Sequence, residues 1–192
     1  MRYMHLEDLL DTVIDHRGRT PKKLGTDFVP DGVPVASAQL VRGGVLDLSE
    51  CRYVDTETWQ RWMPTPLEAG DILLTSEAPL GRTARVESSA PLVLGQRLFA
   101  LRVRDDQLDS RYLFYWLGSH SGQAALHEQA TGSTVLGIRQ SALRRIKVSV
   151  PELSAQRAIG EVLGALDDKI AANRRVIESP MCRWDRHLVE PT

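Results

Sequence analysis

Residues 146–170 read Ile-Lys-Val-Ser-Val-Pro-Glu-Leu-Ser-Ala-Gln-Arg-Ala-Ile-Gly-Glu-Val-Leu-Gly-Ala-Leu-Asp-Asp-Lys-Ile. The first five alternate apolar and polar side chains, which indicates a strand that Pro151 ends. Beyond it a seam recurs at intervals of three and four residues, the spacing of helices that pack on one another. The seam comprises Gln156, Ile159, Leu163, Leu166, Ile170, Asn173 and Ile177. A polar seam residue such as Asn173 would fix the register between two helices.

The long helix is expected to start at Ser154, because serine is a favourable N-cap, and to continue until Pro180 stops it. At 1.5 Å per residue it would be about 36 Å long. We assign 152–179 to a dimerisation and spacer helix and 180–192, which shows no periodicity, to a disordered tail. The alternative is that the seam packs back on its own domain, the usual fate of an amphipathic helix.

Residues 1–151 are expected to form an α+β domain with a curved, mostly antiparallel sheet and flanking helices. The chain has 192 residues, of which 42% are hydrophobic, enough for one core and an extension. Short apolar runs bounded by Gly, Pro and Asp favour strands at 33–37, 72–75, 84–86, 92–94 and 98–103. Helical periodicity favours helices at 6–13, 55–63, 110–117 and 123–129, with Gly122 as a break before the last.

Positive charge is segregated along the chain, although the formal net charge is −1. Segments 16–26, 88–104 and 129–151 contain Arg or Lys and no acid, whereas acids concentrate at 7–15 and 105–109. Such separation can give one face a positive potential, as phosphate binding requires. Of the 24 basic residues 20 are arginine, which suits bidentate contacts to guanine or phosphate, although a GC-rich genome produces the same bias.

Several short motifs precede the helix in a fixed order. They are Gly18-Arg19-Thr20-Pro21, Gly32-Val33-Pro34, Gly70-Asp71-Ile72-Leu73-Leu74-Thr75, Gly81-Arg82, Gly95-Gln96 and Gly132-Ser133-Thr134-Val135-Leu136-Gly137-Ile138-Arg139-Gln140. In this order, and over most of the chain, they resemble the specificity subunit of type I restriction-modification systems. The resemblance implies a target-recognition domain followed by one conserved helix, in a protein that chooses a DNA sequence without catalysing a reaction.

The resemblance also implies the partners. They would be double-stranded DNA, methyltransferase (M) subunits and, in a system that restricts, a restriction (R) subunit. No cofactor is expected in this chain, since S-adenosylmethionine would bind the methyltransferase partner. Two-domain members of the family contain the domain-plus-helix unit twice, whereas this chain contains it once. A homodimer that reads a bipartite target is therefore expected, and a truncated subunit is the alternative.

The candidate DNA-binding residues lie in loops and at loop-to-strand transitions. They are Arg17, Arg19, Thr20, Lys22, Lys23, Arg82, Gln96, Arg97, Ser133, Thr134 and Arg139. Backbone, hydroxyl and cationic donors suit the phosphate backbone, and Arg and Gln suit the edges of guanine and adenine. The loop at 18–23 could instead be an ordinary surface turn. Ser133 and Thr134 could instead be residues that cap a turn.

Other chemistries fit the sequence poorly. A metal-dependent nuclease built on Asp71 and Glu77 would need a lysine at the position of Pro79. His120 and His127 are two helical turns apart without an obvious third ligand, so no metal site is expected. No nucleotide-binding or adenine-methyltransferase motif is present. Two isolated cysteines and the lack of an apolar run of about 18 residues favour a cytoplasmic protein that does not enter a membrane.

Two functions of different classes remain open at this point. The first is a half-length DNA-specificity subunit that dimerises through its helix. The second is a truncated interaction factor that binds methyltransferase subunits through the same helix without recognising DNA. Specific DNA binding with a steep dependence on salt distinguishes the first from the second.

Overall fold

The computed structural model describes residues 2–178 and the side chains of residues 2–176. Ile177 of the predicted seam and the predicted tail at 180–192 therefore lie outside the described side chains. The described chain comprises β1 (Arg2–His5), α1 (Leu6–Leu9), β2 (Leu10–Asp15), η1 (Lys22–Leu24), β3 (Val33–Ala36), η2 (Ala38–Leu40), β4 (Val41–Arg42), β5 (Val45–Leu46), β6 (Arg52–Val54), α2 (Thr56–Trp62), β7 (Ile72–Thr75), β8 (Thr83–Arg85), β9 (Val93–Leu94), β10 (Leu98–Val103), α3 (Ser110–Gly118), α4 (His120–Glu128), α5 (Gln140–Arg144), β11 (Lys147–Val150) and α6 (Leu153–Glu178).

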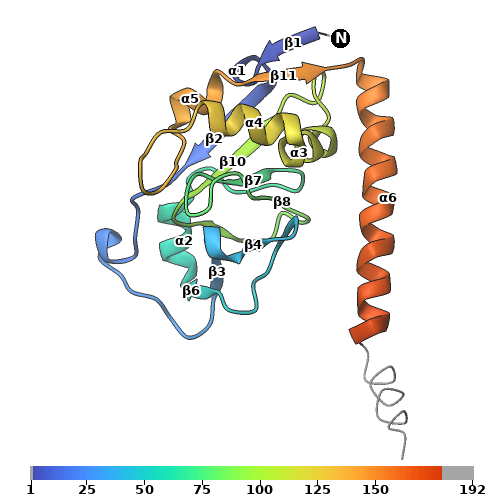
Figure 1. Ribbon diagram of the computed structural model, residues 1–192. Coiled ribbons are helices and arrows are strands. Elements are labelled where there is room, and N and C mark those ends of the chain that lie inside the picture. Colours follow the sequence, from blue (N-terminus) through green and yellow to red (C-terminus); the bar gives the residue numbers. More distant parts are fainter. Residues whose placement is uncertain (1, 179–192) are drawn as a thin grey trace, which may run out of the picture.

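A four-stranded antiparallel sheet in the order β2-β10-β7-β8 forms the centre of the domain (Figure 1). Its middle strand β10 pairs Ala100 with Ile14 of β2 on one side and with Leu73 of β7 on the other. All four residues from Ile72 to Thr75 are buried, because hydrophobic clusters cover both faces of the sheet. The expected α+β class with a mostly antiparallel sheet is confirmed.

The two faces of the central sheet carry different layers. Helices α3 and α4 and the two-stranded β1-β11 sheet pack on one face, around Leu74, Phe99 and Leu113. The smaller β6-β3-β9 sheet and α2 pack on the other face, around Leu73, Leu98 and Trp62. Within this smaller sheet β3 and β9 run parallel, which makes them the exception to the antiparallel pairing of the described strands.

The expected helix at 6–13 is wrong over its second half. The helix α1 ends at Leu9, and Leu10–Asp15 continues as strand β2. Val13 and Ile14 are both buried, against the first and the second cluster respectively. Consecutive residues buried on opposite faces are typical of a strand in the centre of a sheet. The helical spacing of Leu6, Leu9 and Leu10 concealed this strand in the sequence.

The expected break at Gly122 is also wrong. Helix α4 begins at His120, two residues earlier, and Ser119 caps it by accepting a hydrogen bond from the Gly122 amide (3.2 Å). A Cβ on Gly122 would collide with the backbone of Trp116 and Leu117. The glycine therefore permits α4 to turn back closely against the end of α3, instead of ending a helix.

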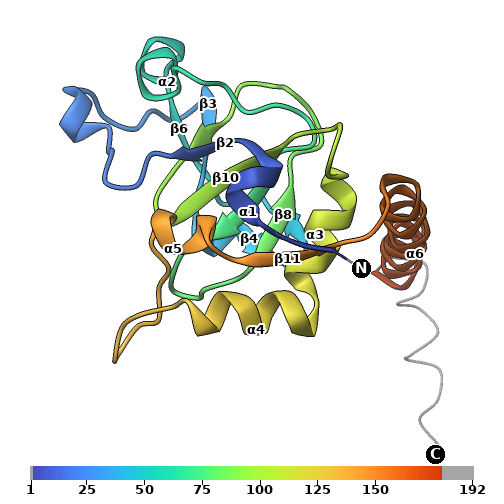
Figure 2. The ribbon, with the colours of Figure 1, turned by 90° about the horizontal axis from the view of Figure 1, so that it is seen from above.

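The strand predicted before the long helix is present as β11 and pairs with β1, a strand that the sequence did not reveal. Helix α6 then begins at Leu153, so Ser154 lies in its first turn and is not its N-cap. Figures 1 and 2 show α6 beside α3 and away from the central sheet. The chain thus closes its domain with a strand and extends a helix along one side.

Candidate nucleic-acid interface

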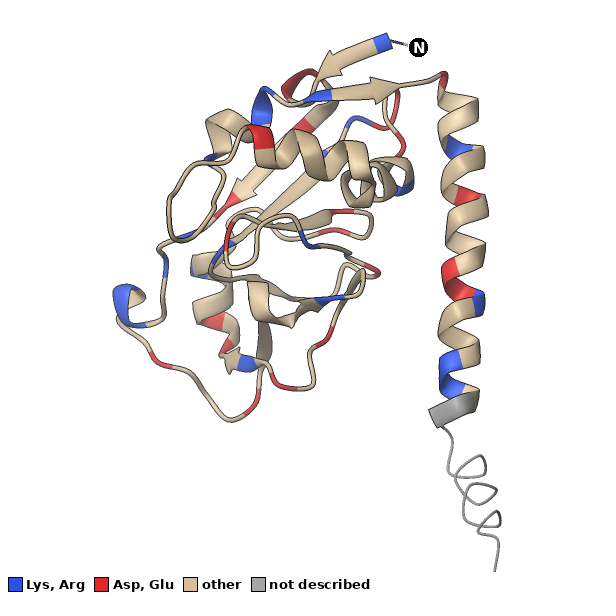
Figure 3. Cartoon of the chain, viewed as in Figure 1, with Lys and Arg blue, Asp and Glu red and all other residues tan. Residues whose placement is uncertain are grey.

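The basic segment 16–26 is an ordered loop between β2 and β3. Lys23 donates its amide to the Thr20 hydroxyl (3.3 Å) and its ammonium to the carbonyl of Gly18 (2.7 Å). The single turn η1 holds Lys22 and Lys23 exposed, and Figure 3 shows their blue turn protruding from the domain on the side opposite α6. Neither lysine forms an ion pair with an acid in the part of the chain that the structure describes.

Gln96 holds the basic loop in place. Its Oε1 accepts from the Gly18 amide (3.3 Å), and its Nε2 donates to the carbonyl of Arg19. The Arg19 guanidinium in turn donates to the carbonyl of Trp62 at 2.5 Å. Gln96 was predicted to contact DNA, but its amide is already used by the loop backbone. Its role in this fold is to position the loop.

Arg17 joins the basic loop to the loop before α5. Its guanidinium forms an ion pair with Asp15 (2.8 Å), lies over the ring of Phe99 (4.1 Å to the centroid) and donates to the carbonyl of Ile138 (3.3 Å). The carboxylate offsets the charge of Arg17, and three contacts fix its geometry. Arg17 therefore links two loops more than it contributes free positive charge.

The loop at 131–137 is closed at its base. Thr131 and Gly137 exchange both backbone hydrogen bonds, at 2.9 and 3.0 Å, and Ile138 donates to the carbonyl of Ser76 (2.9 Å). Ser133 and Thr134 are exposed at its tip, and Arg139 is exposed where the loop ends. The loop thus presents its hydroxyls and its backbone to the outside from a fixed base.

Arg97 and Arg82 have different surroundings. Arg97 has a left-handed backbone (φ +62°), and its guanidinium forms an ion pair with Glu77 (3.3 Å). The backbone of Glu77 forms an antiparallel β-bridge with Gly137 of the neighbouring loop. Arg82 lies instead beside β4, where its guanidinium donates to the carbonyl of Val41 (3.4 Å). Ten of the eleven predicted DNA-binding residues thus belong to three segments that contact one another, 16–26, 96–97 and 131–139, whereas Arg82 lies beside a different strand. We call the surface of these three segments the loop edge.

The loop edge keeps unneutralised positive charge. Asp15 and Glu77 pair with one arginine each, but Lys22 and Arg139 have no acidic partner among residues 2–176. His16 adds no charge at neutral pH, because burial, and then the nearby Arg19, lower the pKa of its imidazole. The edge is therefore cationic at its exposed lysines and arginines and polar at its hydroxyls.

Asp71 has a structural role. It is buried and accepts two hydrogen bonds from the Arg102 guanidinium (2.9 and 2.8 Å) and one from the Glu68 amide (2.8 Å). This accords with the interpretation of Asp71 as a turn acid. Within the described residues no three His, Cys, Asp or Glu side chains gather as metal ligands, and no helix is long and apolar enough to cross a membrane.

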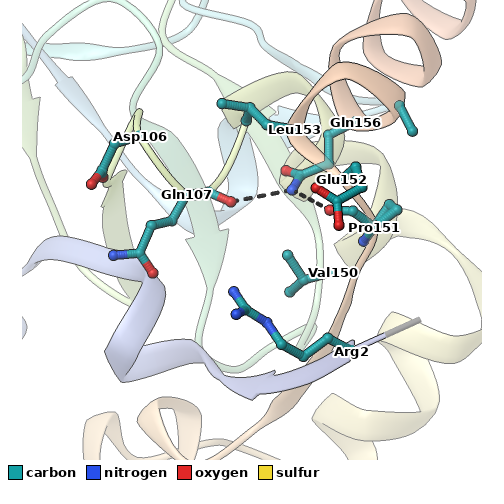
Figure 4. A pocket seen from close by; sticks show the side chains of 9 residues that line it. Arg2, Asp106, Gln107, Val150, Pro151, Glu152, Leu153 and Gln156 are labelled. Atoms are coloured by element: carbon teal, nitrogen blue, oxygen red, sulfur yellow. Dashed lines mark hydrogen bonds between the residues drawn. The ribbon is translucent and has the colours of Figure 1, made fainter.

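One face of α6 is docked on its own domain. Gln156 is buried, and its Oε1 accepts a hydrogen bond from the Asp109 amide (2.9 Å). Its Nε2 donates to the carbonyls of Gln107 (3.1 Å) and Pro151 (2.9 Å), as Figure 4 shows. One turn on, a Cβ at Gly160 would lie 2.9 Å from the Cβ of Arg111 on α3. The glycine lets the two helices approach closely at this point.

The docked face ends near Asp167. The Tyr115 hydroxyl donates to its carboxylate (2.8 Å), and burial, followed by that hydrogen bond, raises the pKa of Tyr115 to about 12. The hydroxyl therefore keeps its proton, and with it this contact, at neutral pH. Gly164 lies between Gly160 and Asp167 on α6, and a Cβ added to it would lie 3.8 Å from the Tyr115 hydroxyl oxygen.

A second face of α6 is left uncovered. Ile159, Leu166 and Ile170 are 40%, 50% and 48% exposed. At about 100° per residue they lie on a flank about a third of a turn from the docked glycines, together with the half-buried Leu163 and the exposed Asn173. We call this flank the apolar stripe. It is the described part of the predicted seam without Gln156, which was also predicted as a dimerisation residue and is buried against its own domain.

The family model for the type I restriction modification DNA specificity domain matches residues 1–179. The chain belongs to this family. The specificity subunit of type I restriction enzyme MjaVIII from Methanocaldococcus jannaschii is 24% identical over 155 residues, which cover 78% of the chain and 36% of that protein. The matched residues include both the domain and helix α6.

Solved structures share the fold of this specificity domain. The HsdS subunit of Thermoanaerobacter tengcongensis superimposes with a TM-score of 0.63 at 23% identity, over 96% of the chain and 42% of that subunit. The S subunit of M. genitalium gives a TM-score of 0.62 at 19% identity, over 92% of the chain and 41% of that subunit. The specificity domain thus spans about two fifths of the length of these relatives.

The sequence left several contributors to the specificity domain's loop edge unrecognised. Glu77, Asp15 and Phe99 hold the arginines in place, yet they are separated from them along the chain or hidden in ordinary strand patterns. The positive φ of Arg97 left no signal either, since glycine is the usual residue there. The acid-free segments were the informative signal, because they include all three segments of the loop edge.

Replacing Gln96 by alanine should loosen the basic loop without changing its charge. The Gly18 amide and the Arg19 carbonyl lose their side-chain partner, so we expect hydrogen exchange across 16–26 to accelerate about tenfold or more, the effect of one lost hydrogen bond. Exchange in β7 and β10 serves as the internal control. Unchanged protection at Gly18 would show that Gln96 does not position the loop.

Replacing Gln156 by alanine should destabilise the docked helix. The Asp109 amide and two carbonyls lose their partner in a buried position, which we expect to lower the free energy of unfolding by about 2–3 kcal/mol. Urea denaturation followed by circular dichroism measures the change. Gln60→Ala, at an exposed glutamine of α2, is the matched control. Equal stability of the two variants would contradict the anchoring role of Gln156.

Proposed function

We propose that this chain is the DNA-reading, non-catalytic component of a type I restriction-modification system. The loop edge would bind double-stranded DNA, and α6 would join two chains through their apolar stripes. Such a pair would carry two recognition domains, at 1–151 of each chain, joined by the helices at 152–179. Each domain would read one half of a bipartite target, in the cytoplasm where the DNA lies.

Methylation would come from partner subunits. The sequence has no motif for binding an adenosyl donor, so S-adenosylmethionine would bind the M subunits that this chain recruits. An adenine inside a duplex cannot be reached by a methyl donor, so the M subunits would flip it out of the stack. An R subunit would join the complex in a system that restricts.

The observation that carries the proposal is the separation of two exposed surfaces on one chain. The cationic loop edge lies on the side of the domain opposite α6 (Figure 3). The apolar stripe lies on a flank of α6 that its own domain leaves uncovered. Phosphate contact requires the first property and helix pairing requires the second. A single chain with both can bind DNA and assemble at the same time.

The charge of the loop edge supports contact with DNA over the interpretation as ordinary surface turns. Four hydrogen bonds, from the side chains of Arg17, Arg19, Lys23 and Gln96 to backbone carbonyls, order the loop at 16–26. None of them neutralises the charge of Lys22 or Lys23 with a carboxylate. Three of these contacts, from Arg17, Arg19 and Gln96, join the loop to distant parts of the chain, and a loop held in this way can keep a fixed position on a duplex.

DNA binding across a salt series tests the proposal. The full chain should bind duplex DNA with an affinity that falls steeply between 50 and 200 mM salt, and it should elute as a dimer. Methylome sequencing of cells with and without the chain should show motif-specific adenine methylation only in its presence. A chain that holds methyltransferase subunits but shows no salt-dependent DNA binding would instead be the interaction factor.

A further inference from the structure

A cleft of about 520 Å³ opens between the basic loop and the smaller sheet. One wall is the basic loop at Arg19–Pro21, another is η2 with Gln39, and a third is Glu50 to Arg52 at the start of β6. Gln96 and Arg97 of the loop edge also line it. Its size is that of a typical small-ligand site, large enough for the edge of a nucleobase.

The polar side chains of the walls that belong to the loop edge are already engaged in part by the protein itself. The Gln96 amide is bonded to Gly18 and Arg19, Arg19 donates to Trp62, and Arg97 pairs with Glu77. These groups can hold the cleft against a phosphate backbone. Lining side chains whose donors and acceptors are all unused are therefore the better candidates for base discrimination.

Gln39 and Glu50 are two lining side chains of that kind. Both are exposed, and neither side chain forms a hydrogen bond or an ion pair within residues 2–176; only the Gln39 backbone carbonyl is used, by Arg42 (2.9 Å). Arg52, next but one to Glu50, lies over the ring of Phe28 instead of pairing with the carboxylate (4.9 Å to the centroid). Both polar groups thus remain available to a ligand in the cleft.

The position of a carboxylate here is informative. An unpaired acid beside cationic walls is repelled by phosphate, so it weakens contact with the DNA backbone. A carboxylate does accept a hydrogen bond from the N4 amino group of cytosine in the major groove, and a glutamine pairs with the N6 and N7 groups of adenine. A base edge is therefore the DNA component that matches both residues.

We propose that Gln39 and Glu50 determine part of the target sequence, with Glu50 selecting cytosine and Gln39 selecting adenine on DNA seated over this cleft. Lys22 and Lys23, on the adjoining loop, would hold the phosphates. This inference rests on the proposed function, because it assigns base reading within the DNA contact of the loop edge.

Selection from a random pool of duplexes tests the inference. The wild-type full chain, Gln39→Ala and Glu50→Gln would each be used to enrich bound sequences, with Glu7→Gln on α1 as a matched control for loss of an exposed acid. We expect Glu50→Gln to lose the cytosine preference at one position and to bind the wild-type motif about ten- to a hundredfold more weakly. Gln39→Ala should relax an adenine position and keep the cytosine. Circular dichroism would confirm that each variant is folded.

The possible outcomes separate this inference from the proposed function. A wild-type chain that enriches no motif would overturn both. A wild-type motif that Glu50→Gln and Gln39→Ala reproduce at every position would overturn the assignment of these two residues and leave DNA recognition intact. Weaker binding of all sequences by Glu50→Gln, without a change of motif, would also contradict the assignment, since loss of an acid alone should strengthen non-specific binding.

Discussion

The double substitution Leu166→Glu and Ile170→Glu is expected to convert the proposed dimer into a monomer of 21.4 kDa. Both side chains are about half exposed on the apolar stripe, at 50% and 48%. Pairing two helices would bury four such side chains, two from each chain, worth about 3–6 kcal/mol at half the value of a fully buried residue. Removing them and adding charges should weaken association by about a thousandfold or more. Size-exclusion chromatography with light scattering measures the mass.

A matched control uses the other flank of the helix. Ala158→Glu and Ala165→Glu add the same charges at exposed positions of α6 that lie more than a quarter turn from the centre of the stripe. This variant should remain a dimer and retain its helix content. If both variants have the same mass as the wild-type chain, the apolar stripe is not the interface. If both are monomers, charge on the helix matters and not the stripe.

Reversing the charge of Lys22 and Arg139 should have a comparably large effect on DNA binding. Both are exposed on the loop edge, and neither has an acidic partner among residues 2–176. Loss of two phosphate contacts should reduce the slope of log affinity against log salt by about 2. With the added repulsion, we expect Lys22→Glu with Arg139→Glu to weaken binding about a hundredfold at physiological salt. Fluorescence anisotropy across a salt series measures both quantities.

The control for this pair keeps the change in net charge and moves it elsewhere. Lys147→Glu on β11 and Arg157→Glu on α6 alter exposed basic residues outside the loop edge. Their affinity should fall only by the long-range effect of net charge, and the salt slope should stay close to that of the wild-type chain. Equal losses in the two variants would show that the loop edge has no particular role.

The elements predicted correctly are those in which one local pattern determines the structure. Strands β7 and β10 are short apolar runs bounded by turn residues, and α3 has a buried face at helical spacing. Helix α1 was overextended because Leu6, Leu9, Leu10 and Val13 satisfy a helical spacing although the last two belong to a strand. There the tertiary pairing with β10 overrides a local pattern.

The candidate site was predictable as a set of segments but not as a set of roles. The acid-free basic segments at 16–26, 88–104 and 129–151 contain all three parts of the loop edge. Gln96 was expected to contact DNA, and in the structure its amide bonds the backbone of the basic loop. Local sequence could not reveal these contacts, because the partners lie 77 and 78 residues away along the chain. Gln156 fitted the heptad and is buried for a similar reason. The composition of a segment indicates a surface, whereas hydrogen-bond partners depend on the fold.

The docking of α6 by Gln156, Gly160 and Tyr115 has a consequence for how such chains can be recombined in evolution. A crossover at Pro151 would join the helix to a foreign domain whose α3 need not accommodate a bare glycine or supply a phenol to Asp167. The hybrid would keep its pairing stripe and lose the angle at which the domain is held. An exchange of domains that preserves this angle would therefore have to carry α3 together with α6 as far as Asp167.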